Sequence, residues 1–247
     1  MAMVAWDPIT GEQHEVPMPD FDFVDWDATV LCAAHARGCN HLHCCSGPFL
    51  VAFMGAYAGM AFACMYSSED GAWGVMTTAE PPLNAYTGMS MAMSPAALVG
   101  NTVYFTTCQG TTTLVEYDLG RRTLAFIDKP VLQFPDRPVV MPWEGGALGY
   151  ATVQGSSLRV FSRDACPDGS AAWTQRRVIE LNTVPTLNLG SSICVAGFVE
   201  AFGVIFISTD TGVFAVTVKS GQIKKVSTSG SIHAIIPYMS FYTPGNF

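Results

Sequence analysis

The alternation of apolar and polar positions between residues 193 and 228 predicts four short β-strands in a row. Short turns that each contain a glycine separate them, and glycine supplies the positive φ that tight hairpins need. Both faces of the resulting antiparallel meander are apolar, so we expect it to pack between similar sheets. The four expected strands are Ile193–Val199, Val204–Ser208, Val213–Val218 and Gln222–Val226.

An outer hairpin with the same pattern recurs along the chain: a strand that ends near an aromatic or apolar residue, a polar turn and a second strand. The spacing of about 45 to 60 residues is typical of the blades of kelch-type propellers. The recurring segments begin at Trp6, Tyr66, Tyr117, Phe161 and Val218.

Two further apolar strands precede each of the later hairpins, and no segment has a helical period. Each unit is therefore expected to be a four-stranded blade, with two inner strands followed by an outer hairpin. The expected inner pairs before the meander are Ala28–Ala34 with Phe49–Met54, Ala96–Val99 with Thr102–Thr107, and Val139–Pro142 with Ala147–Val153.

The predicted fold is all-β, a single kelch-like β-propeller over residues 1–247 with about five four-stranded blades. The ends hold half-blades: an outer hairpin at 1–20 and inner-strand material at 230–243. The two halves either combine into a closing blade, or the ring is incomplete and leaves a sheet edge unpaired. The complete blades are expected at about 27–80, 95–130, 138–182 and 192–228.

The uncharged stretch Pro48–Ser68 has two interpretations. It is about long enough for a membrane-spanning helix and contains a Gly-x-x-x-Gly spacing at Gly55 and Gly59. The alternative is two strands, Phe49–Met54 and Met60–Tyr66. We favour the strands because the flanks lack basic anchors, Pro48 opens the run, and the pair fits the repeat.

The composition of the chain limits the classes of partner that it is expected to bind. Apolar residues make up 49% of the chain and charged residues 13%, and the net charge is −8. A nucleic-acid partner would need a basic face, so none is expected. Seven acidic residues precede the first basic residue, Arg37. We interpret this segment as a solvated face, with attraction of a basic partner as the alternative.

The cysteines and the N-terminal residues indicate the cytosol or nucleus. The first 17 residues lack the basic start and continuous apolar run of a signal peptide. The eight cysteines lie mostly in or beside apolar strands, and we expect reduced thiols. They are Cys32, Cys39, Cys44, Cys45, Cys64, Cys108, Cys166 and Cys194.

No residue is expected to serve as a catalytic, cofactor-binding or metal-binding group. The loop Cys39–Cys45 contains zinc-competent side chains, but five candidates within seven residues are a poor fit to one tetrahedral ion. His14 and His233 each stand alone in a strand. Asp164 and Asp168 fall in a turn, where Asp accepts backbone hydrogen bonds.

Aromatic and methionine residues offer the remaining candidates for binding. Trp6, Trp73 and Trp173 occupy similar hairpin positions and are expected to pack between blades. Positions in loops or at strand ends are predicted for three aromatics. These would anchor a partner if exposed, but we favour the alternative that they fold back on the core. Three methionines suggest either a poorly ordered inter-blade linker, which we favour, or an adaptable surface for binding. The loop aromatics are Trp26, Tyr86 and Trp143, and the methionines are Met89, Met91 and Met93.

Five short phrases at turns and strand ends carry a family resemblance: WDPITGE (6–12), GPFLV (47–51), VEYDL (115–119), QRRVIEL (175–181) and IIPYMSFYTP (235–244). Together they resemble the C-terminal propeller region of plant F-box proteins, over nearly the whole chain. The resemblance implies a protein-binding module that holds a substrate of a ubiquitin ligase. The helical F-box that docks on the ligase adaptor in that family has no counterpart before Trp6, so an adaptor is expected as a partner only if an F-box lies upstream.

Two other functions stay open at this stage. One is a propeller-based enzyme with a site in the central channel, which would need His, Asp or Glu residues on the innermost strands. The strands expected there, such as 28–34, 96–99 and 195–199, are almost wholly apolar. The other is a non-functional product of a truncated gene. We therefore predict a non-enzymatic protein-binding module.

Overall fold

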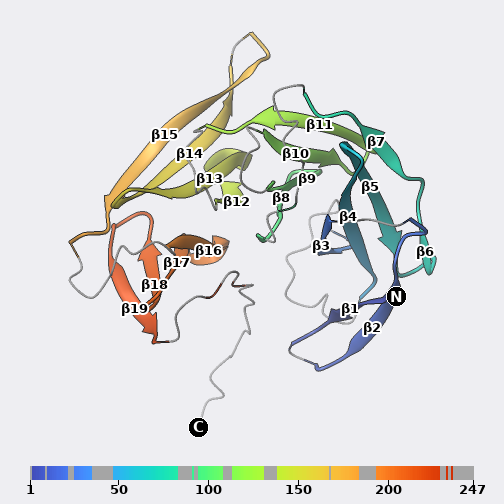
Figure 1. Ribbon diagram of the computed structural model, residues 1–247, viewed down its shortest axis with the longest axis horizontal. Helices are drawn as coiled ribbons and strands as arrows, with labels where there is room; N and C mark the ends of the chain where they lie inside the picture. Colours follow the sequence, from blue (N-terminus) through green and yellow to red (C-terminus); the bar gives the residue numbers. More distant parts are fainter. Residues whose placement is uncertain are drawn as a thin grey trace.

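The chain forms four antiparallel β-sheets arranged as a four-bladed propeller, with a two-stranded hairpin beside the first blade (Figure 1). The computed structural model describes residues 2–8, 10–21, 25–34, 47–82, 91, 94–107, 113–130, 138–166, 168–183, 193–228, 232 and 235. Within these residues the regular structure is β-strand, apart from short 3-10 turns. This confirms the all-β propeller prediction, and the extra hairpin agrees with about five blades in an incomplete ring.

The N-terminal hairpin and blade 1 come first in the chain. Their strands pair antiparallel in chain order, and β7 is an additional short strand that pairs with β5. The hairpin is β1 (Ala2–Trp6) and β2 (Gln13–Pro17). Blade 1 contains β3 (Asp25–Cys32), β4 (Phe49–Tyr57), β5 (Met60–Ser67), β6 (Ala72–Trp73) and β7 (Thr77–Ala79).

Blades 2, 3 and 4 each have four strands in the order of the chain. Blade 2 contains β8 (Ala97–Val99), β9 (Thr102–Phe105), β10 (Thr113–Asp118) and β11 (Thr123–Asp128). Blade 3 contains β12 (Val139–Trp143), β13 (Ala147–Gln154), β14 (Ser157–Ala165) and β15 (Ala171–Glu180). Blade 4 contains β16 (Cys194–Val199), β17 (Val204–Thr209), β18 (Gly212–Thr217) and β19 (Ile223–Ser227).

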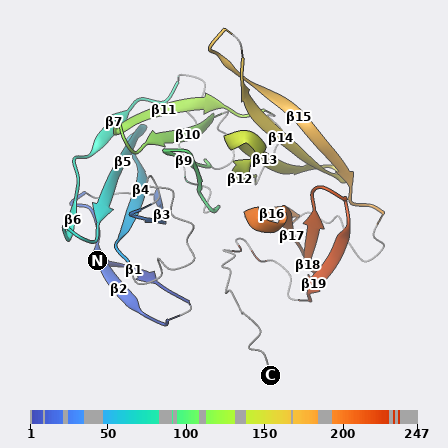
Figure 2. The same cartoon turned by 180° about the vertical axis from the view of Figure 1, so that it is seen from behind.

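The first strand of each blade lies nearest the centre and the last lies at the rim, in views from both sides (Figures 1 and 2). This is the arrangement of inner strands and outer hairpins expected from the sequence. The uncharged stretch 48–68 forms β4 and β5, which confirms the strand interpretation. In the part of the chain that the structure describes, no helix is long and apolar enough to cross a membrane.

Hydrophobic cores lie between neighbouring sheets rather than within one, because both faces of each sheet are apolar. The largest joins blades 3 and 4 and includes Leu158, Ile207 and Phe214, which are fully buried. Similar cores join blade 1 to blade 2 and blade 2 to blade 3. The core between the hairpin and blade 1 is the smallest, with Val16, Val51 and Tyr66 as its buried members. At about 25 cal/mol per Å² of apolar surface, these contacts are the main stabilising term of the propeller.

Two tryptophans fasten neighbouring sheets together in the same way. Trp73 Nε1 donates to the carbonyl oxygen of Pro17, the last residue of β2, at 2.7 Å. Trp173 Nε1 donates to the carbonyl oxygen of Asp128, the last residue of β11, also at 2.7 Å. Each indole comes from the outermost region of one blade and reaches the final strand of the sheet before it, as predicted for packing between blades.

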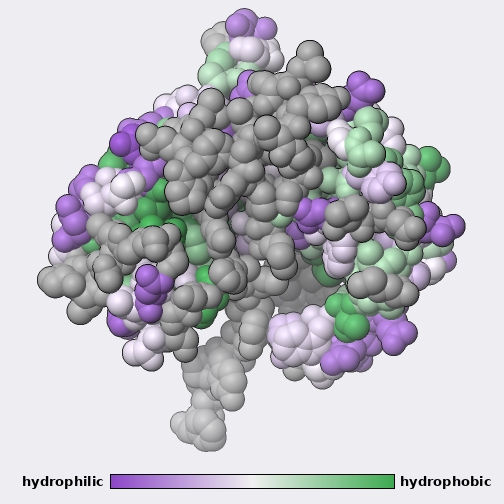
Figure 3. All heavy atoms as spheres, in the orientation of Figure 1, coloured by the Kyte–Doolittle hydropathy of each residue, from purple (hydrophilic) through white to green (hydrophobic). Residues whose placement is uncertain are grey.

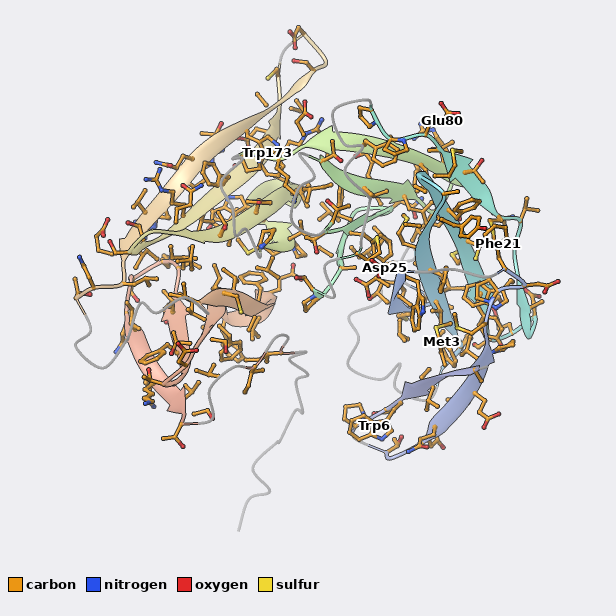
Figure 4. The ribbon with its side chains drawn as sticks, viewed as in Figure 1. Met3, Trp6, Phe21, Asp25, Glu80 and Trp173 are labelled. Atoms are coloured by element: carbon orange, nitrogen blue, oxygen red, sulfur yellow. The ribbon has the colours of Figure 1, made fainter. Side chains whose placement is uncertain are left out.

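The prediction is wrong for Trp6. Its side chain is 60% exposed and lies at the tip of the hairpin (Figure 4). Trp6 ends β1, the first strand of its hairpin, whereas Trp73 and Trp173 lie on the second strand of theirs. Trp6 therefore lies one strand earlier in its hairpin than Trp73 and Trp173 do in theirs, although the local sequence patterns are similar.

A short segment after β19 returns to the inner strand of blade 4. The amide of Ile235 donates to the carbonyl oxygen of Ala196 at 2.6 Å, and the amide of Ile232 donates to Ser208 Oγ at 2.9 Å. Gly197 permits this approach, because a side chain there would collide with the backbone of Ile235. The other residues of the half-blade predicted at 230–243 lie outside the described residues.

Candidate protein-binding groove

A groove of about 920 Å³ lies on the face of the propeller where blades 2, 3 and 4 turn from their first to their second strand. Gly100 lies in the turn between β8 and β9, Glu144–Gly146 form the turn between β12 and β13, and Glu200–Phe202 form the turn between β16 and β17. All three turns line the groove. Equivalent turns of successive blades meet on one face of a propeller, so the repeat itself builds this site.

Each of these three turns holds a glycine with a positive φ, Gly100 among them with φ 60°. Gly145 and Gly146 have φ values of 73° and 75°, a left-handed conformation that other residues adopt only at a cost in free energy. Gly203 closes the turn of blade 4 with φ 57°, and its amide donates to the carbonyl oxygen of Glu200. These turns hold the flanking side chains in fixed positions around the groove.

Three aromatic side chains provide its apolar surface. Trp143 and Phe198 are partly buried and pack against the core between blades 3 and 4. Phe202 is 69% exposed, which is unusual for a large apolar side chain. Aromatic residues anchored in a core and open on one side are the residues that contribute most to protein interfaces.

Basic side chains form one side of the groove. Arg176 and Arg177 are consecutive on β15, where neighbouring side chains normally point to opposite faces of a sheet. A β-bulge shifts the register here, because Val160 pairs with Arg177 whereas Phe161 pairs with Gln175. The extra residue lets both arginines line the groove, as bulges commonly re-aim side chains beside functional sites.

Hydrogen bonds hold both arginines in place. Arg176 Nε donates to Ser162 Oγ at 2.7 Å, and its Nη2 donates to Asp164 Oδ2 at 2.8 Å. Desolvation tends to raise the pKa of Asp164, but the hydrogen bonds from Arg176 and Ser162 outweigh it and lower that pKa. Arg177 Nη2 donates to the carbonyl oxygen of Lys219, which links blade 3 to blade 4 across the groove.

Glu144 and Glu200 add acidic groups at the turns, opposite in sign to Arg176, Arg177 and Lys219. The lining thus combines an aromatic surface with charges of both signs. This composition suits a polypeptide with mixed side chains better than a uniformly charged polymer. It also contains no Ser, Cys or His among the described lining residues.

The aromatic residues suggested by the sequence have different positions. Trp143 lines the groove, so one of the predicted loop anchors belongs to the site. Trp26 instead lies in β3 and stacks on Phe53, with ring centroids 5.6 Å apart. Tyr86 lies outside the described residues.

The other candidates have mainly structural surroundings. His14 packs on Phe49 at 5.3 Å, and Asp168 accepts hydrogen bonds from the amide and hydroxyl of Ser170, as expected in a turn. The turn prediction is wrong for Asp164, which lies in β14. Met91 lies between β7 and β8, the predicted inter-blade position, but it is buried against the core of blades 1 and 2 and not poorly ordered. His233, Met89, Met93 and the Cys39–Cys45 loop lie outside the described residues.

The described cysteines and acidic groups add no metal centre. Cys32, Cys64, Cys166 and Cys194 are free thiols, and burial raises the pKa of the Cys64 thiol to about 12. Among the residues that the structure describes, no group of three or more His, Cys, Asp or Glu side chains is placed to hold a metal ion.

Sequence reasoning missed two features near the centre and the groove. β3 begins at Asp25, three residues earlier than predicted, so the innermost strand of blade 1 carries the carboxyl groups of Asp25 and Asp27. Asp25 Oδ2 accepts the amide of Met91 at 2.9 Å. Phe202 falls in the turn expected between the strands 193–199 and 204–208, and the sequence predicts no binding role for it. One feature of the sequence points to this exposed side chain. It is an aromatic residue directly before a turn glycine, a position from which a side chain does not enter the core.

Comparisons with known proteins give little further information. No family model and no curated protein matches this sequence. One solved structure, described in "Structural and Mechanistic Analysis of Two Prolyl Endopeptidases: Role of Inter-Domain Dynamics in Catalysis and Specificity", aligns with 73% of this chain and 25% of its own chain. The identity is 16% and the TM-score 0.34, too low for any inference about function.

Proposed function

We propose that this propeller is a non-enzymatic protein-binding module whose partner binds in the groove over blades 2, 3 and 4. The single observation that carries the proposal is the exposure of Phe202 beside Trp143 and the two ordered arginines of the bulge. Aromatic and arginine side chains are the residue types enriched at the energetic centre of protein interfaces.

The pre-ordered geometry supports the same function. The hydrogen bonds of Arg176 and Arg177 restrict rotamers before a partner arrives, so less side-chain entropy is lost on binding. The glycine turns fix the rim of the groove in the same way. An interface of this kind can bind with little change of its own backbone.

The finer form of the proposal comes from the resemblance to plant F-box proteins alone. In that form the partner is a protein substrate of a ubiquitin ligase, and the adaptor of the ligase would bind an F-box upstream of the propeller. The groove would then select the substrate, and the chemistry would be done by other subunits.

The test is affinity capture from an extract of the native source, followed by titration of the purified partner. Three chains are compared: the unchanged chain, the double variant Phe202→Asp/Arg177→Glu, and Val75→Asp as control. Val75 is 75% exposed and lies away from the groove. We expect a partner that binds the unchanged and control chains equally, and binds the groove variant at least about 100-fold more weakly.

Equal binding of the partner to all three chains would overturn the proposed site. Circular dichroism and thermal melting of each variant separate loss of the interface from loss of the fold. Turnover of the captured partner by the isolated propeller would contradict the non-enzymatic assignment.

A further inference from the structure

The groove over blades 2, 3 and 4 is acidic at its inner end and basic at its outer end. Glu144 follows β12 and Glu200 follows β16, so both carboxyl groups lie at the ends of innermost strands. Arg177 lies on β15, the outermost strand of blade 3, and Lys219 lies in the turn between β18 and β19. Figure 1 shows β12 and β16 toward the centre of the molecule and β15 and β19 at its outside. These four charged residues line the groove, which therefore runs across the blades from acid to base.

An aromatic side chain lies between the two charged ends. The strands β16, β17 and β18 are neighbours in the sheet of blade 4. Glu200 directly follows β16, Phe202 comes just before β17, and Lys219 comes shortly after β18. The amide of Val218 donates to the carbonyl oxygen of Gly203 at 2.9 Å, which holds the two turns side by side. The order along this edge of the sheet is thus carboxylate, aromatic ring and ammonium.

None of the four charged residues has an ion-pair partner in the part of the chain that the structure describes. Arg176 forms an ion pair with Asp164. Arg177 instead donates to the carbonyl oxygen of Lys219, which orients its guanidinium without neutralising it. The four residues are exposed, and hydrophilic and hydrophobic side chains lie next to each other on the surface of blades 3 and 4, at the left of Figure 3. A bound polypeptide can therefore supply the opposite charges.

The spacing of the strands sets the length of peptide that reaches both charged ends. Neighbouring strands lie about 4.8 Å apart, so the ends of β16 and β18 are separated by about 10 Å. An extended peptide rises about 3.3 Å per residue, and its side chains at positions i, i+2 and i+4 share one face over about 13 Å. Basic and acidic side chains are long and flexible, so they can lean inward and bridge the remaining difference of about 3 Å.

We propose that the partner of this groove contributes an extended segment with a basic, an apolar and an acidic residue at alternate positions. The inference rests on the proposed function and specifies the chemistry of the partner. In either chain direction, the basic residue lies over Glu144 and Glu200, the apolar residue against Phe202, and the acidic residue at Arg177 and Lys219. A segment with a single sign of charge would place like charges together at one end, so the groove selects against it.

The first test is selection from a random peptide library displayed on phage. The full-length chain is the bait, and the double variant Phe202→Asp/Arg177→Glu removes clones that bind elsewhere. We expect the remaining clones to be enriched for a basic, an apolar and an acidic residue at alternate positions, in either direction. Groove-dependent clones without this order would overturn the inference and leave the proposed function standing.

A library that yields no groove-dependent clone would also overturn the inference. The capture experiment then decides the proposed function separately, because a protein that binds the unchanged chain but not the groove variant would still support it. Equal capture by all three chains would overturn both.

The second test exchanges charges between the chain and a selected peptide at the outer end. Binding is measured by fluorescence polarisation for the unchanged chain, Lys219→Glu and the control Lys224→Glu, which makes the same change of net charge at an exposed position of β19 outside the groove. We expect about tenfold weaker binding to Lys219→Glu and a change under about twofold for the control. Replacing the acidic residue of the peptide by lysine should restore binding to Lys219→Glu within about threefold. Equal losses for the two variants, or no recovery with the lysine peptide, would overturn the inference.

The inner end is tested in the same way. Glu200→Arg should weaken binding about tenfold, and a peptide with glutamate in place of its basic residue should recover most of this loss. Glu69→Arg is the control, because Glu69 is exposed in the turn between β5 and β6, outside the groove. A loss at Lys219 without one at Glu200 would show that the groove recognises an acidic residue alone, and would overturn the proposed order.

Discussion

The two ends of the arc are built from the same repeat but are completed to different degrees. Blade 4 has four strands and shares a large core with blade 3, in which Phe214 and Ile207 are fully buried. The hairpin has two strands and shares a small core with blade 1, and it leaves Val4 and Trp6 more than half exposed. The difference shows that a blade of this fold depends on its inner strands for burial.

Two grooves of the molecule also differ, in their position and in the side chains that line them. The groove over blades 2, 3 and 4 lies at turns between complete strands and has an aromatic, charged lining. A second groove, of about 290 Å³, lies between the hairpin and blade 1, and its described lining is apolar. The first has the mixed composition that is typical of protein interfaces, whereas the second has the composition of a hydrophobic core.

The largest expected effect comes from the complete end. Phe214→Ala would leave a cavity in the core between blades 3 and 4 and should lower the free energy of unfolding by about 3–5 kcal/mol. Phe49→Ala, at the partly buried contact of the hairpin with blade 1, should cost less. Urea denaturation of both variants measures the difference. A larger loss for Phe49→Ala would contradict the ranking of the two cores.

The next effect is a dependence of the free energy of unfolding on pH, which arises in blade 1 beside the hairpin. Burial raises the pKa of Asp27 from 3.8 to about 6, with a further contribution from the charge of Asp25. Its Oδ2 is buried without a hydrogen-bond partner in the described structure. Because the folded state holds this proton more tightly than the unfolded state, stability from Asp27 is present near pH 4 and is lost as the pH rises through about 6.

Asp27→Asn removes this titration. A shift from 3.8 to about 6 corresponds to about 3 kcal/mol, so the variant should gain up to that amount over the unchanged chain between pH 4 and pH 7.5. Urea unfolding at the two pH values measures this gain, and the other carboxyl groups cancel in the difference. A constant difference between the two chains would show that Asp27 has an ordinary pKa.

A smaller effect is expected where the C-terminal segment meets blade 4. Gly197→Ala places a methyl group against the backbone of Ile235 and should cost about 1–3 kcal/mol by forcing the segment away from β16. Gly100→Ala provides the contrast, because its positive φ strains the turn but no atom lies within 4 Å of the added carbon. Faster amide exchange at Ile235 in Gly197→Ala alone would confirm that the methyl group displaces the segment from β16. Equal exchange in both variants would exclude this explanation.

The smallest effect is expected when each of three tryptophans is replaced by phenylalanine. Trp173→Phe keeps an aromatic ring but leaves the carbonyl oxygen of Asp128 without its donor, and should cost about 1 kcal/mol. Trp73→Phe should behave alike through Pro17, whereas Trp6→Phe should change stability by less than about 0.5 kcal/mol. Thermal melting of the three variants checks the order. A loss at Trp6 equal to that at Trp173 would show that Trp6 is also a contact between sheets.

The blades could be read from the sequence because their strands are short, rich in Val, Ile and Phe, and separated by glycine turns, as in β16–β19. The site could not be read in the same way. The groove depends on a β-bulge that turns Arg176 and Arg177 to one side, and register is a property of two paired strands rather than of one. Likewise Trp6 and Trp73 share a local pattern but occupy different strands of their hairpins, which only the pairing shows.

The most direct test of the central claim, that the groove over blades 2, 3 and 4 holds a protein partner, is site-specific photo-crosslinking. A photoreactive phenylalanine analogue replaces Phe202 in one chain and Val75 in another, and each is irradiated in an extract of the native source. We predict a discrete crosslinked protein from position 202 that is absent from position 75. The same products from both positions, or none from position 202, would contradict the claim.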